Sequence, residues 1–202
     1  MSARARRRRR RWYETGAFKA LGILVALGIV AVVLVVAFNG TFHKALNELT
    51  LPLEHEDIIR QQAKEKGVDA ALIAAVIDTE SKFTDAESSA GARGLMQVTP
   101  EAAKDIARHS GATTFHTSDL SNPEINIKYG TYLLAERIAQ YDGNVAAALA
   151  SYNAGPGPVE KWGGSELKVD DITYPETRAY VELVLERQKQ YREKYASELG
   201  YG

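Results

Sequence analysis

A single acid ends an apolar helical face in the middle of the chain. The helical spacing i, i+3, i+4, i+7 joins three apolar residues to this acid: Ile73, Val76, Ile77 and Glu80. A carboxyl group on such a face is partly removed from water, which opposes ionisation and raises its pKa. An acid that keeps its proton near neutral pH can protonate a poor leaving group such as a sugar oxygen. The structural alternative is a surface glutamate that pairs with Lys82.

Helix start and stop signals surround this acid. Asp69 is a predicted N-cap of the helix that carries Glu80, and the preceding helix is expected from His55 to Lys66, before Gly67. Small and polar residues over 84–93 predict a loop directly after the acid.

The same signals predict four further helices. They are expected at about 100–109, 123–141, 145–152 and 176–199, each of the first two beginning with a proline. Residues 153–158 contain two glycines and two prolines and are expected to end the third of these helices. No alternating strand pattern appears, so the predicted fold class is all-α (mainly α).

The amino-terminal part has the composition of a membrane anchor. Residues 1–19 contain seven arginines and Lys19 against one acid, and residues 20–38 form an uncharged apolar run. Such a run, as a helix, spans about 28 Å, close to the roughly 30 Å hydrocarbon core of a bilayer. Arginine-rich flanks stay cytoplasmic, so we expect a single-pass protein of the cell membrane. Its parts would be a basic cytoplasmic tail (1–19), a transmembrane helix (20–38), a juxtamembrane linker (39–54) and an extracytoplasmic domain (55–202).

Two alternatives exist for these first residues. A cleaved signal peptide is one, because Val35-Val36-Ala37 resembles a cleavage site, although the apolar run exceeds the usual length of about 7–15 residues. Binding of nucleic acid by the arginines is the other, but a basic block beside a membrane span needs no such partner. We therefore expect a lipid bilayer and no nucleic acid as partner.

Metal and thiol chemistry have no support in the composition. The chain has no cysteine, which excludes disulfides, thiolate metal sites and cysteine nucleophiles. Its four histidines show no close ligand spacing. We expect no metal and no organic cofactor.

Four blocks in order resemble the catalytic domain of the soluble lytic transglycosylase family. They are ESKF at 80–83, GARGLMQVTP at 91–100, ALASYNAG at 148–155 and YPETRAYV at 174–181. The resemblance spans about residues 56–195. It implies a lysozyme-like helical fold that cleaves the β-1,4 bond between N-acetylmuramic acid and N-acetylglucosamine in the glycan strands of peptidoglycan.

The resemblance also implies a mechanism with one acid. Glu80 matches the family's glutamate, which protonates the leaving oxygen and then takes a proton from the sugar's own 6-hydroxyl. That hydroxyl attacks C1 and forms a 1,6-anhydro end. Because an internal hydroxyl replaces water, a second carboxylate is not required.

Substrate contacts follow from the same blocks. The resemblance implies that Met96 and Gln97 face the groove, where the Gln97 amide both donates and accepts hydrogen bonds. It also implies that Tyr152 and Asn153 lie near the acid. As plain structure these residues would be a turn, a core tyrosine and a helix cap.

The family uses a loop serine to orient the N-acetyl group. Here the loop is about one residue shorter than the family pattern and lacks its proline. Spacing back from Gly91 favours Ser88, whereas spacing forward from Glu80 favours Ser89, and both stay candidates.

Two other functions remain open from the sequence. A muramidase that uses water would need the same acid, and a catalytically idle peptidoglycan-binding scaffold would not. Joint presence of Glu80, Gln97, Tyr152 and Asn153 argues against the scaffold. The sequence identifies no protein partner.

Overall fold

The structure is a computed structural model that describes residues 51–110 and 115–202. The expected cytoplasmic tail, the transmembrane helix and most of the linker lie outside the described residues. Residues Pro52–Gly202 form one compact unit. Within the described ranges, no helix combines the length and apolar character that crossing a bilayer requires.

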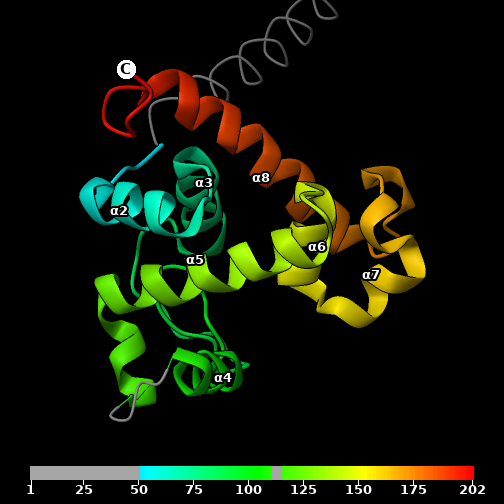
Figure 1. Ribbon diagram of the computed structural model, residues 1–202, viewed down its shortest axis with the longest axis horizontal. Coiled ribbons are helices and arrows are strands. Elements are labelled where there is room, and N and C mark those ends of the chain that lie inside the picture. The colour runs from blue at the N-terminus through cyan, green and yellow to red at the C-terminus, as the bar shows by residue number, and fades with distance from the viewer. Residues whose placement is uncertain (1–50, 111–114) are drawn as a thin grey trace, which may run out of the picture. The chain divides into compact units, whose positions relative to one another are not determined.

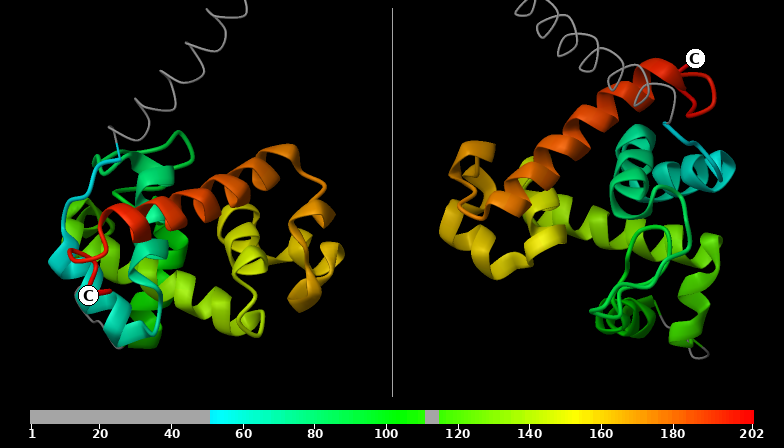
Figure 2. Two further views of the ribbon diagram at one scale, coloured as in Figure 1. Left: turned by 90° about the horizontal axis from the view of Figure 1, so that it is seen from above. Right: turned by 180° about the vertical axis from the view of Figure 1, so that it is seen from behind.

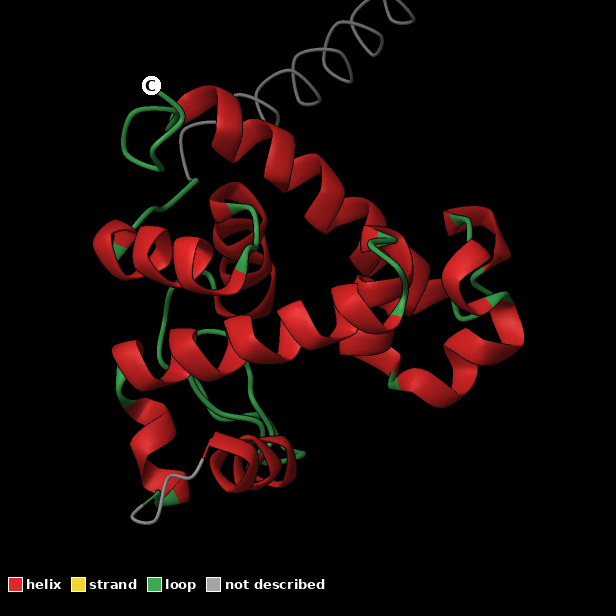
Figure 3. Ribbon diagram, in the orientation of Figure 1, coloured by secondary structure: helices red, strands yellow, loops and turns green. Residues whose placement is uncertain are grey.

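The unit is built from helices (Figure 3). In chain order, α2 to α8 are Glu56–Lys66, Ala70–Ser81, Pro100–Ser110, Pro123–Gln140, Val145–Ala154, Pro156–Trp162 and Pro175–Lys194. Short 3-10 helices occupy Thr117–Ser121 (η1), Gly164–Glu166 (η2) and Val169–Asp171 (η3). The described part contains no strand, only isolated antiparallel bridges from Arg93 to Glu87 and to Val98. The predicted all-α class is therefore confirmed for these residues.

Helix α3 carries Glu80 and lies inside the unit. Its start is the predicted one, because the Asp69 side chain accepts a hydrogen bond from the Leu72 amide. Residues 70–77 are all buried, so α3 is covered on every side rather than along one stripe. It packs against α2 and, most extensively, against α8, which runs beside it in each view (Figures 1 and 2). Each large aliphatic side chain buried here contributes about 1.5–3 kcal/mol relative to exposure.

Two helix ends differ from the sequence-based prediction. Residues 153–158 do end α6, at Ala154, but a new helix, α7, starts at once at Pro156. Gly155 makes the junction with φ of 80°, and a proline at the first helical position has a suitable φ and no amide proton to satisfy. The last helix, α8, ends at Lys194, before the predicted end at Leu199.

A buried asparagine on α5 holds the loop between α3 and α4. Asn126 Nδ2 donates to the carbonyl oxygens of Arg93 (2.8 Å) and Leu120 (2.9 Å), and its Oδ1 accepts from the Met96 amide (2.8 Å). The backbone at Gly94 lies so close that an added Cβ would be 2.1 Å from Asn126 Nδ2, and its φ is +73°. Only glycine fits this position.

Asn126→Ala is expected to destabilise the protein by about 2–4 kcal/mol, because it removes three hydrogen bonds to the backbone, including those of the buried Met96 amide and Leu120 carbonyl. Urea unfolding followed by circular dichroism measures the loss. Gln140→Ala, on the exposed last turn of the same helix, is the control and should change stability by less than about 0.5 kcal/mol. Equal losses in the two variants would contradict the anchoring role.

Candidate active site

Glu80 lies in the last turn of α3 and is partly exposed. Its Oε1 accepts a hydrogen bond of 2.8 Å from the hydroxyl of Tyr180, which lies near the start of α8. The packing of α3 on α8 therefore brings together two side chains that are 100 residues apart in the sequence.

Two opposing effects act on the Glu80 carboxyl. Burial raises its pKa, and the hydrogen bond from Tyr180 lowers it by stabilising the carboxylate. Burial is the larger effect, so the pKa is raised from the ordinary glutamate value. Glu80 thus keeps its proton to higher pH than an ordinary glutamate. When it ionises, the Tyr180 hydroxyl is already in position to donate a hydrogen bond to the carboxylate.

Tyr152 on α6 is the third member of the site. Its hydroxyl donates to the Met96 carbonyl oxygen at 2.8 Å. Burial, followed by the negative charge of Glu80, raises the pKa of Tyr152 well above the usual tyrosine range. The same two causes, in the same order, raise the pKa of Tyr180. Both hydroxyls therefore stay protonated and able to donate at physiological pH.

The chain turns sharply after Glu80. Lys82 and Phe83 adopt left-handed φ values of 55° and 59°, which cost about 1–2 kcal/mol for each residue that is not glycine. Hydrogen bonds compensate: the Ser81 hydroxyl donates to the Leu95 carbonyl at 2.7 Å, and the Thr84 amide donates to the Ser81 carbonyl at 3.1 Å. The second bond closes the turn, and the first connects the end of α3 to the loop segment that contains Met96.

Met96 is not placed as the sequence predicted. Its side chain is fully buried and packs so closely on α5 that a Cβ added to Gly130 would lie 2.5 Å from its Sδ. The expectation that this side chain faces substrate is therefore wrong. Met96 contacts the site through its backbone instead, because its carbonyl oxygen accepts a hydrogen bond from the Tyr152 hydroxyl.

Gln97 is partly exposed and has a left-handed φ of 46°. Its Nε2 donates to the carbonyl oxygens of Ala86 and Gly94, both at 2.9 Å. Both N–H groups of the amide are thus engaged within the loop. The Oε1 atom is the part of this side chain that can accept from a ligand.

The other predicted contacts lie on two elements. Ser88 is partly buried in the loop, where its Oγ accepts from the Ala92 amide at 3.0 Å, whereas Ser89 is exposed. Asn153, at the end of α6, is exposed, and its Oδ1 accepts from the Thr177 hydroxyl of α8 at 2.9 Å. Ser88 shapes the loop, and Asn153 connects two helices.

Sequence reasoning missed two residues of this arrangement. Tyr180 lies in the fourth matching block, 174–181, and that block was the available signal, although it gave the tyrosine no role. Asn126 had no signal, because one polar residue on a helix does not indicate burial. No three histidine or acidic side chains within the described ranges cluster closely enough to hold a metal ion.

The described residues thus define a helical domain with one partly buried acid and two nearby tyrosines. The profile of the transglycosylase SLT domain family matches residues 57–174. The chain therefore belongs to the transglycosylase SLT domain family.

Curated relatives agree with this assignment. The soluble lytic murein transglycosylases of Salmonella typhimurium and Escherichia coli K12 are 32% and 31% identical to the chain over 154 residues, which are 72% of this chain and 24% of theirs. The membrane-bound lytic murein transglycosylase C of Cronobacter sakazakii is 34% identical over 165 residues, which cover 68% of this chain and 46% of that protein. The chain thus spans about a quarter of the length of the soluble relatives.

Solved structures show the same fold. A lytic transglycosylase Slt from Pseudomonas aeruginosa, described as an inactive glutamate-to-glutamine mutant, matches with a TM-score of 0.68 and 34% identity over 72% of this chain and 25% of that one. The 70 kDa soluble lytic transglycosylase of Escherichia coli matches with a TM-score of 0.67 and 31% identity over the same shares. That enzyme type has also been solved in complex with bulgecin A.

Glu80→Gln should raise the melting temperature at pH 7. When the pKa of a carboxyl is higher in the folded than in the unfolded state, its ionisation lowers the free energy of unfolding. This penalty is absent below the ordinary glutamate pKa and complete above the raised pKa. The amide removes the penalty and can still accept from Tyr180. Calorimetric melts at pH 7 and about pH 3.5 should show the gain only at pH 7.

Glu136→Gln, at an exposed position of α5, is the control and should show no gain at either pH. A lower melting temperature for Glu80→Gln at pH 7, or an equal gain at both pH values, would contradict the raised pKa.

Proposed function

We propose that this protein is a peptidoglycan lytic transglycosylase. It cleaves the β-1,4 bond between N-acetylmuramic acid and N-acetylglucosamine and leaves a 1,6-anhydro-muramyl end. The observation that carries the proposal is the Glu80 carboxyl, which has a raised pKa and accepts a 2.8 Å hydrogen bond from Tyr180, in a chain of the SLT family. The relatives named above are lytic transglycosylases, which supports this reaction over others.

In the first step, protonated Glu80 gives its proton to the glycosidic oxygen as the bond to C1 breaks. The Tyr180 hydroxyl donates to Oε1, so Oε2 is the oxygen left to hold that proton. Once the proton has gone, Glu80 is a carboxylate, and the Tyr180 hydrogen bond stabilises it.

In the second step, the carboxylate takes a proton from the 6-hydroxyl of the muramyl residue. The oxygen of that hydroxyl attacks C1 and closes the 1,6-anhydro ring, so Glu80 regains its starting proton and no water is consumed. General acid and base catalysis of this kind contributes about 10²–10⁴-fold in rate. A relative with one glutamate replaced by glutamine is inactive, and we assign Glu80 the corresponding role.

The substrate contacts are proposed from the residues around the acid. They are Ser88 or Ser89, the Oε1 atom of Gln97, Tyr152 and Asn153. Met96 supports Tyr152 through its backbone and is not among them.

Product analysis tests the reaction. Full-length protein incubated with peptidoglycan sacculi should release fragments with 1,6-anhydro ends, identified by mass spectrometry. Glu80→Gln should lose at least about 100-fold of the rate, while Glu136→Gln retains it. Only reducing ends would identify a water-using muramidase instead. Binding without cleavage by the wild-type protein would indicate the idle scaffold.

The membrane topology is a separate proposal. The apolar run 20–38 is long enough to span, and the Cronobacter sakazakii relative is named membrane-bound. The tail 1–19 would be cytoplasmic, 39–54 would be the linker, and the catalytic domain 55–202 would be extracytoplasmic.

Protease added to intact spheroplasts should degrade the domain and leave a membrane fragment with the basic tail, while a cytoplasmic marker protein survives. Protection of the domain would contradict this topology. A mature protein that starts after Ala37 would identify a cleaved signal peptide.

A further inference from the structure

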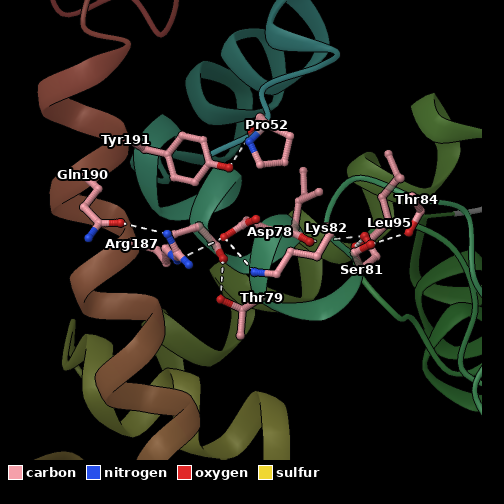
Figure 4. A network of polar contacts seen from close by, with 12 residues as sticks. Pro52, Asp78, Thr79, Ser81, Lys82, Thr84, Leu95, Arg187, Gln190 and Tyr191 are labelled. Carbon is pink, nitrogen blue, oxygen red and sulfur yellow. Dashed lines mark hydrogen bonds and ion pairs between the residues drawn. The ribbon is translucent and has the colours of Figure 1, made fainter. Parts of the chain in front are cut away.

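Asp78 is a buried carboxylate that the proposed reaction does not use. It lies on α3 two residues before Glu80, and its side chain is 1% exposed. Its Oδ2 is 3.2 Å from Nε of Arg187 on α8 and 3.1 Å from Nζ of Lys82 (Figure 4). Two cations from different elements therefore meet one carboxylate oxygen.

Arg187 and Tyr180 occupy the same face of α8. They are seven residues apart, or about two helical turns, so both side chains point toward α3. Val184 and Tyr191 continue this row, and both are fully buried. The row on α8 thus contacts Glu80 at one point and Asp78 at another.

The two contacts reach α3 on different sides. Successive residues of a helix are rotated by about 100°, so the Asp78 and Glu80 side chains leave α3 about 200° apart. Apolar packing sets the overall placement of α3, and a single polar contact near its end leaves a small rotation against α8 open. Two contacts in different directions fix that rotation, and with it the position of the Glu80 carboxyl relative to Tyr180.

Stability alone does not explain the buried pair. Replacing a buried ion pair by apolar residues of similar volume is often neutral or stabilising, because removing two charges from water is costly. Asp78 Oδ1 also has no hydrogen-bond partner among the described residues, which adds to that cost. Arg187 Nε likewise makes no hydrogen bond among the described residues, so its contact with Asp78 is an ion pair. What this ion pair supplies is an attraction between two particular points on α3 and α8, which apolar side chains do not.

We propose that Asp78 and Arg187 are positioning residues that orient α3 on α8 so that the Tyr180 hydroxyl meets Glu80, with Lys82 as the second cation on Asp78. A role of these residues in catalysis rests on the proposed function, but their effect on the contact between Glu80 and Tyr180 can be tested without any substrate. The groups that face Glu80 are Tyr180 from α8 and Tyr152 from α6.

The test follows the titration of the Glu80 carboxyl carbon by 13C NMR in the free full-length protein, with Glu80→Gln used to assign the signal. Tyr180→Phe should raise the pKa of Glu80, because the carboxylate loses its donor. Asp78→Asn should raise it too, through displacement of the same donor. Charge alone predicts the opposite, since loss of the Asp78 charge leaves Lys82 and Arg187 without the carboxylate that offsets their charge.

A double variant and two further substitutions sharpen the test. If Asp78 acts on Glu80 through Tyr180, the double variant Asp78→Asn with Tyr180→Phe should have a Glu80 pKa no higher than that of Tyr180→Phe alone. Arg187→Lys keeps the charge but has a methylene group in place of the Nε that contacts Asp78, so it should also raise the pKa of Glu80. Arg192→Gln removes an exposed ion pair with Asp69 at the other end of α3 and should leave the titration unchanged.

An unchanged or lowered pKa of Glu80 in Asp78→Asn with a native circular dichroism spectrum would overturn the proposal. If that variant does not fold, Arg187→Lys decides: an unchanged pKa overturns the proposal. With sacculi as substrate, Arg187→Lys should reduce kcat about tenfold with little change in KM. Absence of cleavage by the wild-type protein would refute the proposed function and leave the titration result intact.

Discussion

The surrounding helices must hold the Glu80 carboxyl and the Tyr180 hydroxyl within hydrogen-bonding distance of each other. Desolvation opposes ionisation of this carboxyl. The hydrogen bond from Tyr180 favours ionisation and partly offsets that effect, so the group can lose a proton and its negative charge is then stabilised. The hydrogen bond weakens when its donor–acceptor distance lengthens by a few tenths of an ångström. A helix that is buried on all sides and a second helix packed along it provide that accuracy.

The loop after α3 is held by polar contacts in addition to the apolar packing of Leu95, Met96 and Val98. Ser81 connects it to the end of α3, Asn126 holds it on α5, and Tyr152 binds its Met96 carbonyl from α6. Each of these groups is buried or partly buried, so an unmade bond would cost more than a made bond gains. The loop therefore has few alternative positions, and the residues around Glu80 are ordered before any ligand is bound.

Local signals in the sequence predicted much of this. The cap at Asp69 and the apolar spacing before Glu80 located α3 and its acid, because both depend on residues within a few positions of each other. The partner Tyr180 and the anchor Asn126 could not be derived, since their contacts join residues far apart in the chain. Met96 was misplaced because the direction of a loop side chain depends on the packing of that loop on α5.

The central claim is that Glu80 holds its proton more tightly than an ordinary glutamate. Titration of its carboxyl carbon in the wild-type protein, by 13C NMR between about pH 3 and 8, measures this directly. The account predicts a midpoint above the ordinary glutamate value. A midpoint at or below that value would contradict it.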